Sequence, residues 1–153
     1  MHIETNKDSL FSSIISKLPY GKDFLFVDEI QYIDKDKIIG TYKFNSSANF
    51  YNSHFLHKPI TPGVILIEAM GQIGMVSHLI FLNNLHISNK NFIPLFSNVE
   101  TSFYKTVERG AKIKVVGHKI YFRNNVLKSE IKLYNELEEL CVLGKAQLSL
   151  KYE

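Results

Sequence analysis

The stretch HFLHKPITPGVILIEAMGQ, residues 54–72, holds the side chains best suited to chemistry, His54 and Glu68. An imidazole titrates near neutral pH and can act as a general base. A carboxyl group buried without a cation favours its protonated form and can act as a general acid. No Lys or Arg lies within two helical turns of Glu68 in the sequence. The alternatives are a surface histidine and an acid held in a structural ion pair.

A glycine and an amide complete this group. Thr61 is a suitable N-cap and Pro62 suits the first position of a helix, so Gly63 is expected as the second helical residue. Its N–H would have no partner within the helix and could stabilise an oxyanion. A glycine that merely eases a tight helix start is the alternative. Gln72 follows Glu68 by one turn and could orient its carboxyl group, or be satisfied elsewhere as a buried amide.

These residues need elements that position them. The apolar run predicts a long helix from Thr61 to about Leu85, preceded by a short helix over 8–17 and strands over 24–33 and 37–44. Further strands are expected over 98–107, 112–123, 126–135 and 140–152, and the alternation in KSEIKLYN and KAQLSLKY is the period-two pattern of strands with one covered face. We therefore expect an α+β fold, in which one curled antiparallel sheet surrounds one central helix, as a single domain over 1–153.

Composition excludes several functional classes. The 153 residues are 45% hydrophobic and 22% charged, with a net charge of +3, which is typical of a globular protein and too mild for a nucleic-acid binder. Basic residues do gather between Lys105 and Lys128. They form either a solvated face or a docking surface for an acidic partner.

The apolar run is not expected to span a membrane. Residues 64–82 are long enough, but Glu68, Gln72, Ser77 and His78 interrupt them and no basic cluster flanks them. The N-terminus lacks the pattern of a signal peptide, and the single Cys141 suits a reducing compartment. A cytoplasmic location follows. The histidines show no metal-ligand spacing, so we expect no metal site, and a structural role for His57 and His78.

Three segments carry a resemblance to a known family. They are LPYGKDFLFVDEI, NFYNSHFLHKPITPGVILIEAMGQ and FSNVETSFYKTVERGAKI. The combined spacing of His54, Pro59, Pro62-Gly63, Glu68 and Gln72 is their most specific feature. The chain resembles the 3-hydroxyacyl-[acyl-carrier-protein] dehydratases of the hot-dog fold, in which a sheet wraps a long helix.

The resemblance implies a reaction and its residues. The reaction is the reversible dehydration of (3R)-hydroxyacyl-acyl-carrier-protein to the trans-2-enoyl form, in fatty acid or related polyene or lipid biosynthesis, without a cofactor. His54 would take the proton from C2, Glu68 would protonate the leaving hydroxyl and the Gly63 amide would hold the enolate. The residues expected to bind substrate are Phe55, Pro62, Val64 and Gln72.

The resemblance also implies partners. They are acyl carrier protein and a second subunit, in a homodimer, a larger assembly of dimers or a heterodimer with a related subunit, with His54 and Glu68 acting across the subunit interface. Ser53, Leu56-His57 and Tyr20-Gly21 depart from the family pattern. These departures leave two alternatives open, an inactive subunit that binds acyl chains or braces an active partner, and an acyl thioesterase of the same fold.

Overall fold

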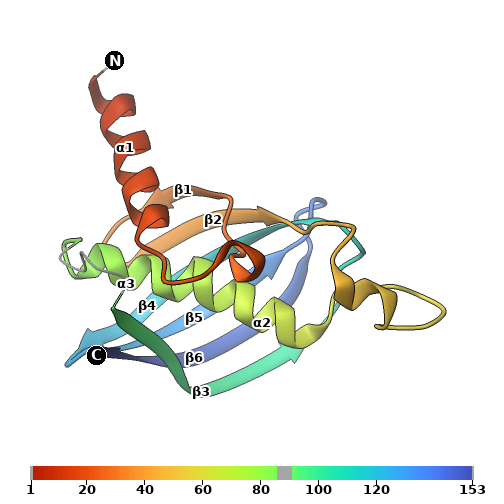
Figure 1. Ribbon diagram of the computed structural model, residues 1–153. Coiled ribbons are helices and arrows are strands. Elements are labelled where there is room, and N and C mark those ends of the chain that lie inside the picture. Colours follow the sequence, from red (N-terminus) through yellow and green to blue (C-terminus); the bar gives the residue numbers. More distant parts are fainter. Residues whose placement is uncertain (1, 86–90, 153) are drawn as a thin grey trace.

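A six-stranded antiparallel sheet curls around one long helix (Figure 1). The computed structural model describes residues 2–85 and 91–152, with side chains from residue 7 onward. In chain order the helices and strands are α1 (His2–Ser16), β1 (Glu29–Ile33), β2 (Lys37–Lys43), α2 (Gly63–Gly71), a π-helical segment η3 (Gln72–Val76), α3 (Ser77–Leu82), β3 (Phe92–Phe103), β4 (Lys112–Arg123), β5 (Val126–Tyr134) and β6 (Leu140–Tyr152), with short 3₁₀ turns at Lys22–Phe24 and Asn49–Asn52. The predicted α+β class is confirmed.

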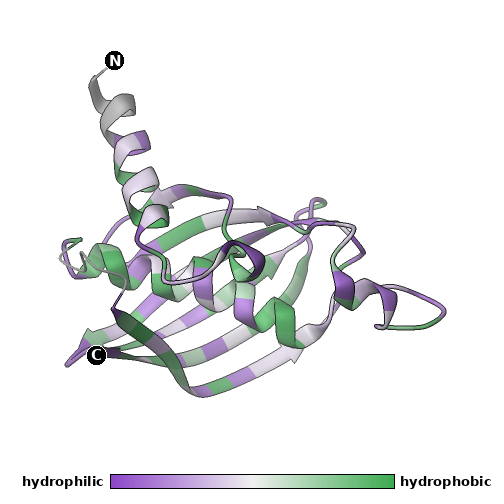
Figure 2. Cartoon of the chain, in the orientation of Figure 1, coloured by the Kyte–Doolittle hydropathy of each residue, from purple (hydrophilic) through white to green (hydrophobic). Residues whose placement is uncertain are grey.

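The strand order is β1-β2-β4-β5-β6-β3, which leaves β1 and β3 at the two edges. Alternating burial runs without interruption through β5, where Leu127, Ile131 and Leu133 face the helix. Figure 2 shows this alternation as hydrophilic and hydrophobic bands across the strands. Because side chains alternate between the faces of a sheet, the period-two pattern places one apolar face against the helix.

The central helix contacts the sheet most closely where two glycines face each other. A Cβ atom at Gly117 on β4 would overlap the carbonyl oxygen of Gly74 in the π-helical segment. The Ser77 hydroxyl donates to the carbonyl of Gln72 at 2.7 Å. In a regular α-helix this carbonyl would accept from the backbone N–H four residues further along the chain. The two glycines therefore allow the helix backbone to lie directly on the sheet.

The helix from Gly63 to Leu82 is long and apolar enough to cross a membrane by length and composition. However, 72% of its most apolar window is buried within the described structure. All residues from Ala69 to Ile80 are buried, whereas Val64 is 73% exposed. This burial is that of a core helix, with one face left open near its N-terminus.

Several predicted boundaries are wrong. The helix starts at Gly63 and ends at Leu82, and Thr61 is not its cap, because Pro62 holds that position without a side-chain cap. The first helix begins at His2, six residues before the prediction. The first strand begins at Glu29 and not at residue 24, and residues 22–24 form a 3₁₀ turn. The strand after the helix spans Phe92–Phe103, and part of the loop predicted before it, residues 86–90, lies outside the described residues.

Candidate active site

The start of the helix is pinned by buried hydroxyl groups. The Tyr51 hydroxyl lies 2.7 Å from the Thr61 hydroxyl, which in turn lies 3.3 Å from the carbonyl of Glu108. The N–H of Gly110 donates to the Tyr51 hydroxyl at 3.2 Å, and the N–H of Thr61 donates to the carbonyl of Val107 at 2.8 Å. Because the Thr61 hydroxyl is engaged in these hydrogen bonds, it does not cap the helix. The network holds the helix start against the connection between β3 and β4.

His54 lies in the loop that projects from the sheet between β2 and α2, coloured yellow-orange in Figure 1. Its backbone N–H donates to Phe50 at 3.0 Å, and its carbonyl accepts from Ile60 at 2.9 Å. Its Nδ1 lies 3.3 Å from the carbonyl oxygen of Ile60. A carbonyl oxygen only accepts, so in the neutral ring this contact favours the tautomer with its proton on Nδ1 and its lone pair on Nε2. The loop thus presents His54 with one basic nitrogen available.

A hollow of about 320 Å³ opens between this loop and the helix start. Its lining includes His54, Phe55, Gly63, Leu66 and Phe103, and it is mainly apolar. Gly63 is the first helical residue, and no hydrogen-bond acceptor is found for its N–H among the described residues. That N–H lies at the positive end of the helix dipole. The hollow therefore combines a base with a donor suited to an anion.

The bare Cα of Gly63 makes room for an aromatic ring. A Cβ atom there would lie 3.0 Å from the Cε1 and Cζ atoms of Phe103 on β3. The missing side chain leaves room for a substrate carbonyl to approach the Gly63 N–H. The structure adds a second reason for this glycine, because Phe103 packs against it.

Glu68 lies one and a half turns further along the helix and does not line this hollow. It is half-buried, rather than fully enclosed as the apolar run suggested. Its Oε2 accepts from Gln72 Nε2 at 2.9 Å, and no ion pair involves it among the described residues.

Gln72 is fully buried and uses its whole amide group. Besides the bond to Glu68, its Nε2 donates to the carbonyl of Phe24 at 3.0 Å and its Oε1 accepts from the N–H of Phe26 at 2.8 Å. The amide thus ties the segment before β1 to the helix and holds the Glu68 carboxyl in one orientation. With no exposed surface, Gln72 reaches the site through Glu68.

Tyr20, one of the departures from the family pattern, lies near Glu68. Burial, and then the Glu68 carboxylate, raise the pKa of the Tyr20 hydroxyl above its ordinary value. Because the Tyr20 hydroxyl keeps its proton, it adds no negative charge beside Glu68. The sequence marked this position as unusual, but nothing in it indicated proximity to a residue 48 positions away.

The remaining predicted substrate-binding residues lie in different surroundings. Phe55 is 56% exposed and lines the hollow. Its ring stacks on the ring of His54, with 4.0 Å between the two ring centroids. Pro62 is buried at the helix start, and Val64 points outward on the open helix face. The structure therefore groups His54, Phe55 and Gly63, and it places Glu68 with Gln72 beyond them.

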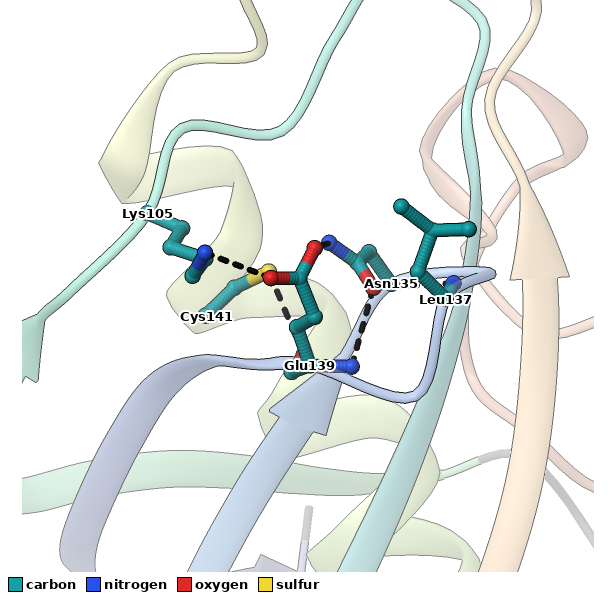
Figure 3. Close-up of polar contacts among 5 residues, drawn as sticks. All are labelled: Lys105, Asn135, Leu137, Glu139 and Cys141. Carbon is teal, nitrogen blue, oxygen red and sulfur yellow. Dashed lines mark hydrogen bonds and ion pairs between the residues drawn. The ribbon is translucent and has the colours of Figure 1, made fainter.

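Lys105 lies at the rim of the hollow. The sequence did not indicate that this residue would lie beside the site. Figure 3 shows how the turn between β5 and β6 holds it. Its Nζ lies 2.5 Å from Glu139 Oε2, while Asn135 Nδ2 donates to Glu139 Oε1 at 3.1 Å. The hydrogen bond from Lys105 is the main cause that lowers the pKa of the Glu139 carboxyl, and the bond from Asn135 adds to it. Lys114 and Lys119 likewise face Glu138 and Asp36, so acids from other elements partly neutralise the basic span.

Comparison with known proteins decides the family. Residues 18–138 match the model of the FabA-like domain. The chain belongs to the FabA-like family. A 3-hydroxyacyl-[acyl-carrier-protein] dehydratase FabZ from Caldicellulosiruptor saccharolyticus is 31% identical over 133 residues, which cover 85% of this chain and 91% of the relative. The same enzyme from Clostridium tetani is 29% identical over 140 residues, covering 86% and 94%. The resemblance stated from the sequence motifs is confirmed.

Solved structures show the same fold. A dehydratase heterocomplex, ApeI:P from Xenorhabdus doucetiae, superposes with a TM-score of 0.78 at 10% identity, over 92% of this chain and 91% of that chain. A thioesterase from Haemophilus influenzae superposes with a TM-score of 0.56 at 16% identity, over 81% and 78%. At these identities the likeness concerns fold alone, and it confirms the predicted hot-dog architecture.

Proposed function

We propose that this member of the FabA-like family catalyses the reversible dehydration of (3R)-hydroxyacyl thioesters on acyl carrier protein. The observation that carries the proposal is the hollow at the helix start, where the His54 ring and the Gly63 N–H lie together. His54 Nε2 removes a proton from C2, and the Gly63 N–H stabilises the enolate oxygen that forms at the thioester. The C3–O bond then breaks, and the hydroxyl leaves as water with a proton from Glu68. No cofactor takes part.

The separation of His54 from Glu68 supports a site shared between two subunits. Strand β3 is an edge with one side unpaired, and it exposes apolar side chains, among them Leu95 at 49%, Val99 at 38% and Phe103 at 51%. An open apolar edge favours pairing with another chain. A two-fold dimer through this edge would cover Val64 and the open helix face. Each site would then use His54 and Gly63 of one chain and Glu68 of the other.

Acyl carrier protein would dock near the rim of the hollow. Lys105 lies there, and the acidic side chain that holds it is more than one-third exposed, so an acidic partner can compete for the ammonium group. The reaction and its carrier protein suit the cytoplasm.

Two inactive variants test both the chemistry and the sharing. His54→Ala and Glu68→Gln should each lose most hydration of a trans-2-enoyl thioester while keeping the fold, as circular dichroism would show. After subunit exchange between the two variants, half of the dimers are mixed and each carries one intact site of two, so activity should recover to roughly a quarter of wild type.

Two results would contradict the proposal. Near wild-type turnover by either folded variant would remove that residue from the mechanism. No recovery, with exchange verified by tagged chains, would mean that the two residues do not act across an interface. The products separate the alternatives, because a thioesterase releases free thiol and an inactive subunit changes neither thiol nor double bond.

A further inference from the structure

The central helix covers one face of the sheet (Figure 1), and the opposite, outer face carries half of the Lys and Arg residues of the chain. Side chains alternate between the two faces of a strand, and the buried Leu127, Ile131 and Leu133 on β5 identify the inner face. The strand registers then assign nine of the 18 basic residues to the outer face, namely Lys37, Lys43, Lys112, Lys114, Arg123, Lys128, Lys132, Lys145 and Lys151. Of the described strand acids, only Glu29, Glu100 and Glu130 share that face. The outer face therefore has an excess of six positive charges, twice the net charge of +3 of the whole chain.

Most of the cations on this outer face have no acidic partner. Only Lys114 and Lys132 form ion pairs among the described residues. Lys43 on β2 lies directly opposite Lys112 on β4, and like charges in that arrangement destabilise a sheet. The fold thus tolerates repulsion that a partner with negative charge would relieve.

The cations nearest the turn between β4 and β5 form a group that we call the basic end of the outer face. Its members are Arg123, Lys128 and Lys151, and no acid of the described outer face lies among them. Arg123 lies over the ring of Tyr121, 5.1 Å from its centroid, and Tyr121 lies opposite Lys128. Lys151 lies opposite Ile93, which is 38% exposed. The basic end therefore combines unpaired cations with an aromatic ring and an exposed apolar side chain.

The basic end is compact enough to act on one patch of negative charge. Strands β4, β5 and β6 are neighbours in the sheet, and neighbouring strands lie about 5 Å apart. The three cations are therefore within about 10 Å of one another across the strands, which is about one Debye length at physiological salt. The face curves away from this end with the curl of the sheet, so a flat partner would meet only part of it.

We propose that the outer face docks the protein on an anionic lipid surface, with the basic end at the centre of the contact. Eight of the nine outer-face cations are lysines. A lysine is a point charge on a flexible apolar stem, which suits mobile headgroups, whereas arginine is favoured where phosphates and bases of nucleic acids are bound in a fixed geometry. Tyrosine and isoleucine side chains between such cations suit the boundary between headgroups and acyl chains.

This docking is separate from the proposed dehydration. The His54 hollow lies at the start of the central helix, on the inner side of the sheet, so a bilayer against the outer face leaves the hollow open. Docking would hold the enzyme at the membrane surface without inserting a helix, and the apolar helix from Gly63 to Leu82 stays in the core.

The test is sedimentation of the full chain with vesicles of phosphatidylcholine, either pure or with about one third phosphatidylglycerol. The wild type should bind the anionic vesicles, bind pure phosphatidylcholine little, and lose affinity as salt is added. Each cation near an anionic surface contributes about fivefold in affinity, so the triple variant R123Q/K128Q/K151Q should bind about a hundredfold more weakly.

A second triple variant, K7Q/K22Q/K35Q, is the matched control. These three lysines are exposed and lie outside the strands of the sheet, so the same loss of charge should change binding little. Both triple variants should keep the circular dichroism of the wild type and its turnover of a soluble trans-2-enoyl thioester. If the outer-face triple variant does not fold, Lys151→Gln alone should still weaken binding about fivefold.

Three results would overturn the docking proposal and leave the proposed dehydration standing. One is equal binding of the wild type to neutral and anionic vesicles, or binding to neither. Another is an equal loss of affinity in the two triple variants, which would assign the effect to net charge alone. The third is tighter binding to single-stranded DNA than to anionic vesicles at equal phosphate concentration, which would assign the outer face to nucleic acid.

Discussion

The buried amide of Gln72 offers a quantitative test of how the site is built, through Gln72→Met. The substitution keeps most of the side-chain volume but removes three hydrogen bonds. The N–H of Phe26 then stays buried without its partner, which costs about 1–3 kcal/mol, and each lost bond adds about 1 kcal/mol unless water replaces it. The Phe24 carbonyl and Glu68 are partly exposed and can regain water. We expect the free energy of unfolding to fall by about 2–4 kcal/mol.

Urea denaturation of the variant measures this loss, and Gln147→Met supplies the control. Gln147 is half-buried and its side chain accepts one hydrogen bond, from the Tyr121 hydroxyl at 3.0 Å, so its replacement should cost about 1 kcal/mol or less. Because Gln72 also orients Glu68, its loss should lower kcat about ten- to a hundredfold with little change in KM. Equal stability of the two variants, or an unchanged kcat for Gln72→Met, would refute the reasoning.

Two further predictions concern the fold. Burial lowers the pKa of His78, whose Nε2 lies 2.8 Å from the Asp34 carbonyl, so the folded state prefers the neutral ring. The contribution of His78 to the free energy of unfolding should therefore be complete above about pH 6.5 and should decrease as the pH falls below that value. Urea titrations on both sides of that pH should show this loss, and His78→Gln should reduce it; an unreduced loss would assign it to other groups. Gly117→Ala should cost about 3 kcal/mol or more, because its Cβ would overlap a backbone carbonyl, whereas Gly144→Ala, 3.5 Å from the Met70 methyl, should stay within about 1 kcal/mol. Equal melting temperatures for these two variants would contradict the close helix–sheet contact.

Local patterns in the sequence were enough to predict most of the elements. The bounds of β4 (Lys112–Arg123) and β6 (Leu140–Tyr152) agree with the prediction, and β5 ends one residue earlier. Strand alternation and the apolar helix are properties of neighbouring residues, so they are visible without any tertiary contact. The resemblance to the family was also visible in the sequence, in three segments whose most specific feature is the spacing within residues 54–72.

The errors fall where a distant residue competes with a local preference. Thr61 has the chemistry of an N-cap, but Tyr51 and Glu108 take its hydroxyl and move the helix start to Gly63. Residues 24–27 are the apolar run Phe-Leu-Phe-Val, which is typical of a strand, but Gln72 binds the backbone of Phe24 and Phe26. Propensity sets a weak preference of a fraction of a kcal/mol, which one buried hydrogen bond can override.

The sequence by itself determined which groups could transfer protons, on which element each lies and which family they indicate, because these depend on residue type and spacing along the chain. Only the tertiary structure decided that Glu68 is half-buried and lies outside the His54 hollow, that Tyr20 lies near Glu68, and that Phe96 faces Gly71. Each of these is a contact between elements distant in the chain. Such contacts are selected by how the whole sheet curls around the helix, since close packing admits few arrangements of the same side chains.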